Sequence, residues 1–219
     1  GQPSRGGKVK LWHARDGQFV REFKDAHSDT VFGLEFSPEG QYLASAAADK
    51  FVKVFDVSSG KLTKSFEGHT HHVLDVSWNR NRRVLASSGA DKVIKVWDFV
   101  TGERKRSISN FAKEVTSIRY IGYTDQTLVS AGDPKVSIFR DNGESVRTFD
   151  GPESYMFCSD VTPDGATIVA GGQDGILRIW DGSGTQIASF APLKVDAPED
   201  QKSVVRRGES ETRTKEPES

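Results

Sequence analysis

Two stretches of the chain repeat one another at a spacing of 42 residues. YLASAAADKFVKVFD (residues 42–56) and VLASSGADKVIKVWD (residues 84–98) carry a serine, an aspartate and a terminal aromatic residue in the same order. A histidine precedes each stretch, His27 and His69, and these are also 42 residues apart. Because four positions match with identical internal spacing, the pattern indicates a structural repeat.

The repeat continues along most of the chain. The aromatic residue that ends the third segment of each unit falls at Trp12, Phe55, Trp97, Phe139 and Trp180, at intervals of 41 to 43 residues. The segments between turns are short, alternate apolar with polar residues and lack helical periodicity, which predicts β-strands. Each unit therefore predicts four strands, and a strand pair at 8–12 and 18–23 precedes the first complete unit.

Sheets of four short strands cannot bury both faces alone, and radial stacking solves this problem. The sequence therefore predicts an all-β fold, a partial β-propeller of about four and a half blades. The expected parts are a two-strand remnant of a truncated blade at 1–23, blades at 24–66, 67–108, 109–149 and 150–190, and a disordered polar tail at 191–219. An open arc leaves two sheet faces uncovered, so we expect self-association unless remaining blades, expected N-terminal to this segment, complete it.

Composition excludes several classes of function. Thirty Lys and Arg against thirty-one Asp and Glu give a net charge of −1, which argues against a dedicated nucleic-acid-binding surface. No run of 18 apolar residues occurs, so we expect no membrane insertion. The single cysteine, Cys158, excludes an internal disulfide framework. Its position in an expected inner strand predicts a small buried apolar residue.

The dipeptides that open and close the units match a known pattern. Gly68-His69 opens the second unit, Trp97-Asp98 closes it, and Trp180-Asp181 closes the last one. Together with the period and the turn residues, these dipeptides make residues 8–190 resemble the WD-repeat family. The resemblance implies a β-propeller that serves as a non-catalytic protein-protein interaction scaffold.

The resemblance also implies a hydrogen-bonded chain within each blade. Its members are the histidine, a serine of the second strand, the aspartate of the following turn and the aromatic residue of the third strand. The candidates are His27, Ser45, Asp49 and Phe55 in the first unit, His69, Ser87, Asp91 and Trp97 in the second, Ser130, Asp133 and Phe139 in the third, and Asp174 and Trp180 in the fourth. Only the second set is complete, so we expect the second unit to be the most rigid blade.

A finer similarity concerns GQPSRGGKVKLW, AHSDTVFGLEFSP and GHTHHVLDVSW. These runs are similar to propeller modules of planctomycete-type bacterial multidomain proteins, in which such repeats are fused to c-type cytochrome domains. No CxxCH motif occurs in this chain, so no haem is expected in it. The similarity implies a larger bacterial protein with a fused redox domain, or a hydrolytic one, that the propeller serves.

Histidine, serine and aspartate together also fit a hydrolase triad. The repetition of the set and the lack of a strained nucleophile turn favour a structural role, so we expect no enzyme activity. His69, His71 and His72 suggest a metal site, but no carboxylate stands at ligand spacing and a surface loop is the preferred interpretation. No cofactor and no metal are therefore expected.

Without catalysis, function is expected on a surface. In a propeller, the loops that carry the histidines gather at one end of the central channel. The predicted contact positions for a protein or peptide partner are Thr30, Phe32, His72, Leu74, Glu114, Thr116, Tyr155 and Phe157. Alternatively, the apolar side chains among them pack between blades and form no binding surface. A second alternative to a protein partner is a small ligand bound in the channel near Asp75.

Overall fold

The computed structural model describes residues 6–80 and 83–192. Regular structure in these residues consists of eighteen β-strands. They form one two-stranded and four four-stranded antiparallel sheets, which confirms the predicted all-β class. Within the same ranges, no helix has the length and apolar character needed to cross a membrane. The predicted tail falls almost wholly in residues 193–219, which lie outside the described residues.

The strands follow one another in chain order within each sheet. The two-stranded sheet pairs β1 (Val9–Trp12) with β2 (Phe19–Phe23). The first two four-stranded sheets comprise β3 (Val31–Phe36), β4 (Tyr42–Ala47), β5 (Val52–Asp56), β6 (Leu62–Phe66), and then β7 (Val73–Trp78), β8 (Val84–Gly89), β9 (Ile94–Asp98), β10 (Arg104–Ile108). The last two comprise β11 (Val115–Tyr120), β12 (Gln126–Ala131), β13 (Lys135–Arg140), β14 (Ser145–Phe149), and then β15 (Met156–Val161), β16 (Thr167–Gly172), β17 (Leu177–Asp181), β18 (Gln186–Phe190).

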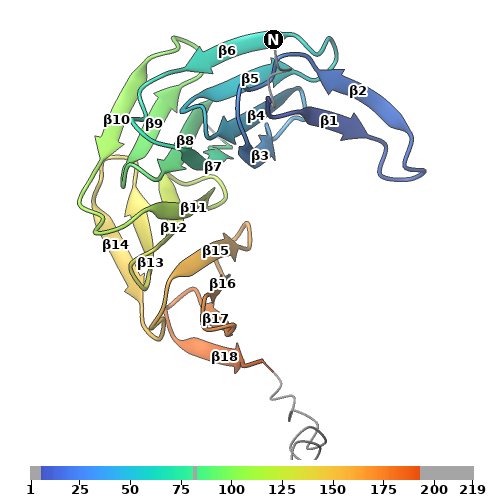
Figure 1. The fold of residues 1–219 in the computed structure, drawn as a ribbon. Helices are drawn as coiled ribbons and strands as arrows, with labels where there is room; N and C mark the ends of the chain where they lie inside the picture. The colour runs from blue at the N-terminus through green and yellow to red at the C-terminus, as the bar shows by residue number, and fades with distance from the viewer. Residues whose placement is uncertain (1–5, 81–82, 193–219) are drawn as a thin grey trace, which may run out of the picture.

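The sheets stand side by side around an open arc (Figure 1). The first strand of each four-stranded sheet faces the hollow of the arc, and the fourth strand lies on the outer rim. Each of the four inner strands has a register shift near its start, at a β-bulge between the first and third residues. This arrangement confirms the predicted partial propeller, and it brings the four strand starts together at one end of the hollow.

Apolar side chains fill the space between neighbouring sheets. Between the first two four-stranded sheets, Val52 and Val54 pack with Val73, Val76 and Trp78. Comparable clusters join the second sheet to the third and the third to the fourth. The strands are short because each sheet needs only enough length to cover its neighbour, and burial of these apolar faces stabilises the stack.

Basic side chains also link neighbouring sheets at the outer rim. Lys64 Nζ of β6 donates to the Val100 carbonyl, 3.2 Å away, in the turn of the next sheet. Arg147 of β14 donates likewise to the Gly182 carbonyl. The Arg21 side chain of β2 lies against Gly60, which has a φ of +72°. Gly60 lies in the corresponding turn of the following sheet, between β5 and β6. The third residue of an outer strand thus reaches over the next turn at three of the four joints.

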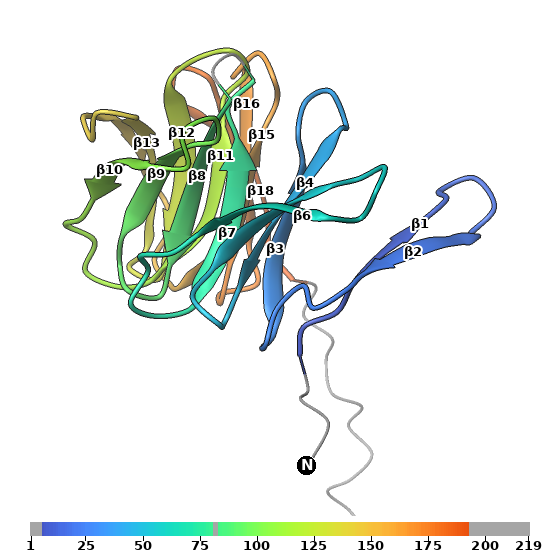
Figure 2. The same cartoon turned by 90° about the horizontal axis from the view of Figure 1, so that it is seen from above.

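Both ends of the arc leave apolar surface uncovered. The β1–β2 hairpin projects at one end of the arc (Figure 2), and its Val9 and Phe23 pack with Phe55 of the first four-stranded sheet. Trp12, however, is 53% exposed, whereas its counterpart Trp97 is 2% exposed. At the other end, Leu177 and Ile187 of the last sheet are 43% and 59% exposed. Cys158 lies on this sheet and is exposed. The prediction of a buried cysteine was therefore wrong, because no described sheet covers that face.

Candidate functional site

The second four-stranded sheet holds a continuous chain of buried hydrogen bonds. Trp97 Nε1 donates to Ser87 Oγ at 2.8 Å, and Ser87 Oγ lies 2.8 Å from His69 Nε2. His69 Nδ1 lies 2.9 Å from an Asp91 oxygen. Because the aspartate can only accept, His69 donates to it through Nδ1, and the Ser87 hydroxyl, which accepts from Trp97, can donate its own proton to Nε2. Every member is satisfied, so the chain ties the entry loop, two strands and a turn into one unit.

The first sheet has the same chain without its indole donor. His27 Nδ1 lies 2.9 Å from both oxygens of Asp49, and its Nε2 lies 2.7 Å from Ser45 Oγ. Burial lowers the pKa of His27, against the raising effect of Asp49, which agrees with a neutral ring that accepts through Nε2. Phe55 occupies the tryptophan position, is 1% exposed and contributes packing alone.

The third sheet replaces the polar chain with apolar contacts. Phe111, at the histidine position, meets Phe139 edge to face at a centroid distance of 5.3 Å, and Val129 packs in the same cluster. The assignment of Ser130 to the serine position was wrong. Ser87 pairs with Lys95 and Ser88 with Ile94, while Val129 pairs with Ser137 and Ser130 with Val136. Ser130 is therefore the counterpart of Ser88, and its apparent spacing of three residues from Asp133 comes from this one-residue offset.

In the fourth sheet an arginine takes the place of the histidine as the partner of the aspartate. Arg178 Nη2 of β17 lies 2.7 Å from Asp174 Oδ2, and Arg178 is 6% exposed. The ion pair with Arg178 holds the pKa of Asp174 below its usual value. Trp180 Nε1 donates to the Asp150 carbonyl at 3.0 Å. The sequence analysis did not identify Arg178, although the equivalent strand positions also carry a cation, Lys53 in β5 and Lys95 in β9.

These sets do not form a catalytic centre. Ser87 and Ser45 are both 0% exposed, so neither hydroxyl is accessible to a substrate. Their histidines and aspartates are fully used within the hydrogen-bonded chains. Among the described residues, no group of three or more His, Cys, Asp or Glu side chains is placed to hold a metal ion.

The predicted contact positions meet at the end of the hollow where the inner strands begin. Thr30, His72, Glu114 and Tyr155 are structurally equivalent, because the carbonyl of each accepts a hydrogen bond from the backbone that follows the second strand of its sheet. Those donors are Ala48, Ala90, Gly132 and Gln173, respectively. Thr30 is exposed, whereas His72, Glu114 and Tyr155 are half-buried.

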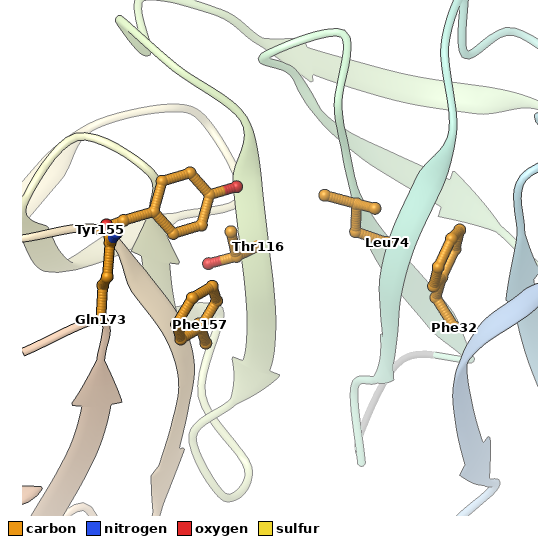
Figure 3. A pocket seen from close by; sticks show the side chains of 6 residues that line it. All are labelled: Phe32, Leu74, Thr116, Tyr155, Phe157 and Gln173. Carbon is orange, nitrogen blue, oxygen red and sulfur yellow. The ribbon is translucent and has the colours of Figure 1, made fainter. Parts of the chain in front are cut away.

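Five residues of the inner strands and their entry loops, together with Gln173, line a pocket with a volume of about 510 Å³. Phe32 and Leu74 lie on one side of the opening, and Thr116, Tyr155 and Phe157 lie on the other (Figure 3). Phe32 and Phe157 are 50% and 55% exposed. The structure thus brings five of the predicted contact residues to one pocket, four from the inner strands and Tyr155 from an entry loop. Phe32 and Phe157 are thus not packed between blades, whereas Thr116 also links the third and fourth sheets, because its Oγ1 donates to the Met156 carbonyl at 2.9 Å.

Aromatic pairs shape both walls of this pocket. The ring of His72 lies 6.1 Å from that of Phe32, and the Tyr155 and Phe157 rings are 5.2 Å apart. Gly132 permits this arrangement, since a Cβ there would lie 2.5 Å from the Tyr155 ring and 3.0 Å from a Glu114 carboxylate oxygen. Burial and the Glu114 carboxylate, to which the hydroxyl donates a hydrogen bond, raise the pKa of Tyr155. One carboxylate therefore stands at the wall of an otherwise neutral pocket.

Each inner strand carries one charged residue: Glu35, Asp75, Arg119 and Asp160 in chain order. Arg119 Nη1 lies 2.6 Å from Asp75 Oδ2, and the same oxygen accepts from the Ile118 amide at 3.1 Å. Asp75 is 6% exposed. These bonds join the second sheet to the third along the channel and leave Asp75 enclosed, so the expected channel ligand has no access to its carboxylate.

Comparison with known proteins agrees with this architecture. The family model described as "WD domain, G-beta repeat" matches residues 17–56, 60–98 and 143–181, more than half of the chain. The chain therefore belongs to the WD-repeat family. The segment 99–142, which holds β11, β12 and β13 of the third unit, lies outside the matched segments; this unit is the one whose hydrogen-bonded chain has been replaced by apolar contacts.

Several fungal and animal proteins are similar in sequence. "Nuclear distribution protein PAC1" of Arthroderma otae is 30% identical over 174 residues, which cover 74% of this chain and 38% of that protein. "Nuclear distribution protein PAC1-2" of Uncinocarpus reesii is 33% identical over 180 residues, 76% of this chain and 39% of that protein. "Cilia- and flagella-associated protein 52" of Sus scrofa is 30% identical over 69 residues, 32% of this chain and 11% of that protein. The chain thus spans about two fifths of the length of the nuclear distribution proteins.

A solved structure shares the fold. The structure titled "Structure of U3-55K" superposes with a TM-score of 0.78 at 21% sequence identity, over 84% of this chain and 58% of that chain. At this level of identity the similarity establishes the propeller architecture.

Proposed function

We propose that this chain is part of a non-catalytic protein-interaction scaffold whose partner binds at the pocket of Phe32, Leu74, Thr116, Tyr155, Phe157 and Gln173. The observation that carries the proposal is the pocket itself. About 510 Å³ of space is lined by aromatic and aliphatic side chains that the fold leaves half exposed. Exposed apolar clusters of this kind, rimmed by polar loops, mark sites of partner binding.

Membership of the WD-repeat family supports a scaffold role. The histidine, serine and aspartate residues, which could have formed a hydrolase site, are used to fix the sheets. Named relatives are called nuclear distribution or cilia- and flagella-associated proteins, and these names describe placement and assembly more than chemistry. The rigid sheets would then hold the pocket loops in a fixed geometry, which lowers the entropy cost of binding.

We also propose that further blades cover the two ends of the arc in the complete protein. Leu34 and Phe36 of β3 are 49% and 47% exposed on the side that faces the hairpin, where a preceding blade would supply two inner strands. The similar propeller extends well beyond the matched region, since this chain covers 58% of it. Additional blades would bury both apolar end faces and complete the wall of the pocket.

Affinity capture with the full-length protein tests the binding face. Tyr155→Ala removes a ring that lines the pocket, and His72→Ala removes the ring next to Phe32; both variants are expected to lose the partner recovered by the wild type. Tyr123→Ala is the matched control, because Tyr123 is 69% exposed on a turn at the opposite ends of the strands. Equal recovery by all four proteins would exclude this face.

Two other functions are kept as alternatives, and the first follows from the finer sequence similarity. One is a propeller module that serves a fused c-type cytochrome or hydrolytic domain of a bacterial multidomain protein; a CxxCH motif or a hydrolase domain in the extended reading frame would support it. The relatives described above are fungal and mammalian. The second is a small-ligand sensor in the channel, which a thermal-shift screen with metals and metabolites would reveal. Because Asp75 is enclosed, such a ligand would have to bind above it, in the pocket.

A further inference from the structure

The charged residues carried by the four inner strands are mostly acidic. The residues that line the pocket carry no formal charge at neutral pH, and the Glu114 carboxylate lies beside the Tyr155 ring, since both approach Gly132 closely. Farther along the inner strands, the three carboxylates of Glu35, Asp75 and Asp160 accompany one guanidinium, that of Arg119. The ion pair of Arg119 with Asp75 uses the one cation of the inner strands, so Glu35 and Asp160 have no second basic partner on those strands.

Aromatic faces and a carboxylate together favour a cation with a long apolar stem. The electron-rich faces of the Phe32, Tyr155 and Phe157 rings attract a positive group. An aliphatic stem of three or four methylene groups matches the apolar walls, while its charged tip stays at a polar group. Acidic side chains are disfavoured at the same place, because they would meet Glu114 and the mostly acidic charged residues of the inner strands.

We infer that the partner anchors itself in this pocket through an arginine or lysine side chain of an extended segment, whose cationic tip pairs with Glu114. This inference rests on the proposed function, since it names the chemistry that the proposed binding face recognises. Glu114 is suited to the role because its carboxylate has accepting capacity beyond the single bond from the Tyr155 hydroxyl. Because Glu114 is half-buried, salt screens its attraction for a cation less than it would at a fully exposed site.

A random peptide library provides the test without a known partner. The full chain, fluorescently labelled, is incubated with resin-bound random heptapeptides that have acetylated ends, and the peptides on the brightest beads are sequenced. We expect arginine plus lysine to be enriched about fivefold or more over its share of the library. Binding of the selected peptides should weaken as NaCl rises from low to high concentration, because screening shortens the reach of the charges.

Glu114→Gln separates charge recognition from folding. Glutamine retains an acceptor for the Tyr155 hydroxyl, so the wall keeps its shape, but the negative charge is lost. The variant is expected to lose the enrichment for basic residues and to bind the selected peptides about fivefold more weakly. Glu103→Gln makes the same change on an exposed turn at the opposite end of the sheets, and its selection should equal that of the wild type.

The outcomes distinguish this inference from the proposed function. Selection of aliphatic or aromatic peptides that Tyr155→Ala abolishes and Glu114→Gln leaves intact would overturn the basic anchor and retain the binding face. Selection of acidic peptides would also overturn it. If no peptide is selected, or if Tyr155→Ala selects as the wild type does, both the basic anchor and the binding face are refuted.

Discussion

Replacing Ser87 with alanine should destabilise the protein more than the same change at Ser45. The two serines stand at equivalent positions, and both are fully buried. Ser87 lies between two partners, since it donates to His69 and accepts from Trp97. Ser45 serves one ring partner, His27, because the residue at the tryptophan position of its sheet is phenylalanine.

The expected difference follows from the groups left without a partner. Ser87→Ala leaves two ring groups without a partner, the Nε2 acceptor of His69 and the Nε1 donor of Trp97. Ser45→Ala leaves one ring group, the His27 acceptor, and removes a long contact of 3.3 Å with the Lys53 carbonyl. Each buried polar group without a partner costs about 1 to 3 kcal/mol. The free energy of unfolding should therefore fall by about 1 to 3 kcal/mol more in Ser87→Ala than in Ser45→Ala.

Urea unfolding followed by circular dichroism measures both variants, and hydrogen exchange of the β8 amides reports the stability of the second four-stranded sheet separately. A double-mutant cycle isolates the tryptophan contribution. In a Trp97→Phe background the indole donor is already absent, so Ser87→Ala should cost no more than Ser45→Ala does in the wild type. Equal costs of the two serine changes in the wild type, or a Ser87→Ala cost that Trp97→Phe does not alter, would refute the proposed chain.

Four further outcomes are expected. Gly33→Ala should lower the free energy of unfolding by about 1 to 3 kcal/mol, measured in urea, because its Cβ would lie 2.8 Å from the Asp75 Cα atom. Arg178→Met should destabilise by a similar amount, about 1 to 3 kcal/mol, and adding Asp174→Asn should restore most of it; no recovery would refute the ion-pair role. Burial holds the pKa of His27 below the usual histidine value of about 6.5, so the unfolded state binds the proton first and the free energy of unfolding should fall as the pH drops below about 6.5. His27→Gln should reduce that slope, and an unchanged slope would contradict the assignment. Amides of β8 should exchange more slowly than those of β16, because the chain of hydrogen bonds is complete only in the second unit.

The sequence predicts the sheets well because the repeat constrains them. Every strand must present an apolar face to a neighbouring sheet, so apolar alternation and turn residues recur with the period of the unit. The residue before each inner strand, and with it the second residue of that strand, could likewise be found by counting from the histidine position. This is why the positions of Phe32, Leu74, Thr116 and Phe157 emerge from spacing alone.

Other features depend on pairing between strands or on neighbours distant in sequence. Ser130 was assigned by residue type, but strand register places Val129 at the serine position. The pairing of Arg178 with Asp174 depends on side-chain reach across a turn, which spacing does not reveal. Exposure of Cys158 depends on whether another sheet covers the last one. Gln173 was missed because its counterparts are small residues, although its size at this position was a usable signal.

The third unit shows how a propeller repeat can change its chemistry without losing its shape. Phe111, Val129 and Phe139 occupy the places of a histidine, a serine and a tryptophan, and they belong to one apolar cluster in which the two rings meet edge to face. A histidine restored at 111 alone would face valine and phenylalanine with no hydroxyl beside its Nε2. A serine restored at 129 alone would find no imidazole. Reversion by single substitutions thus passes through destabilised intermediates, so the two kinds of blade are separated by an evolutionary barrier although they share one backbone.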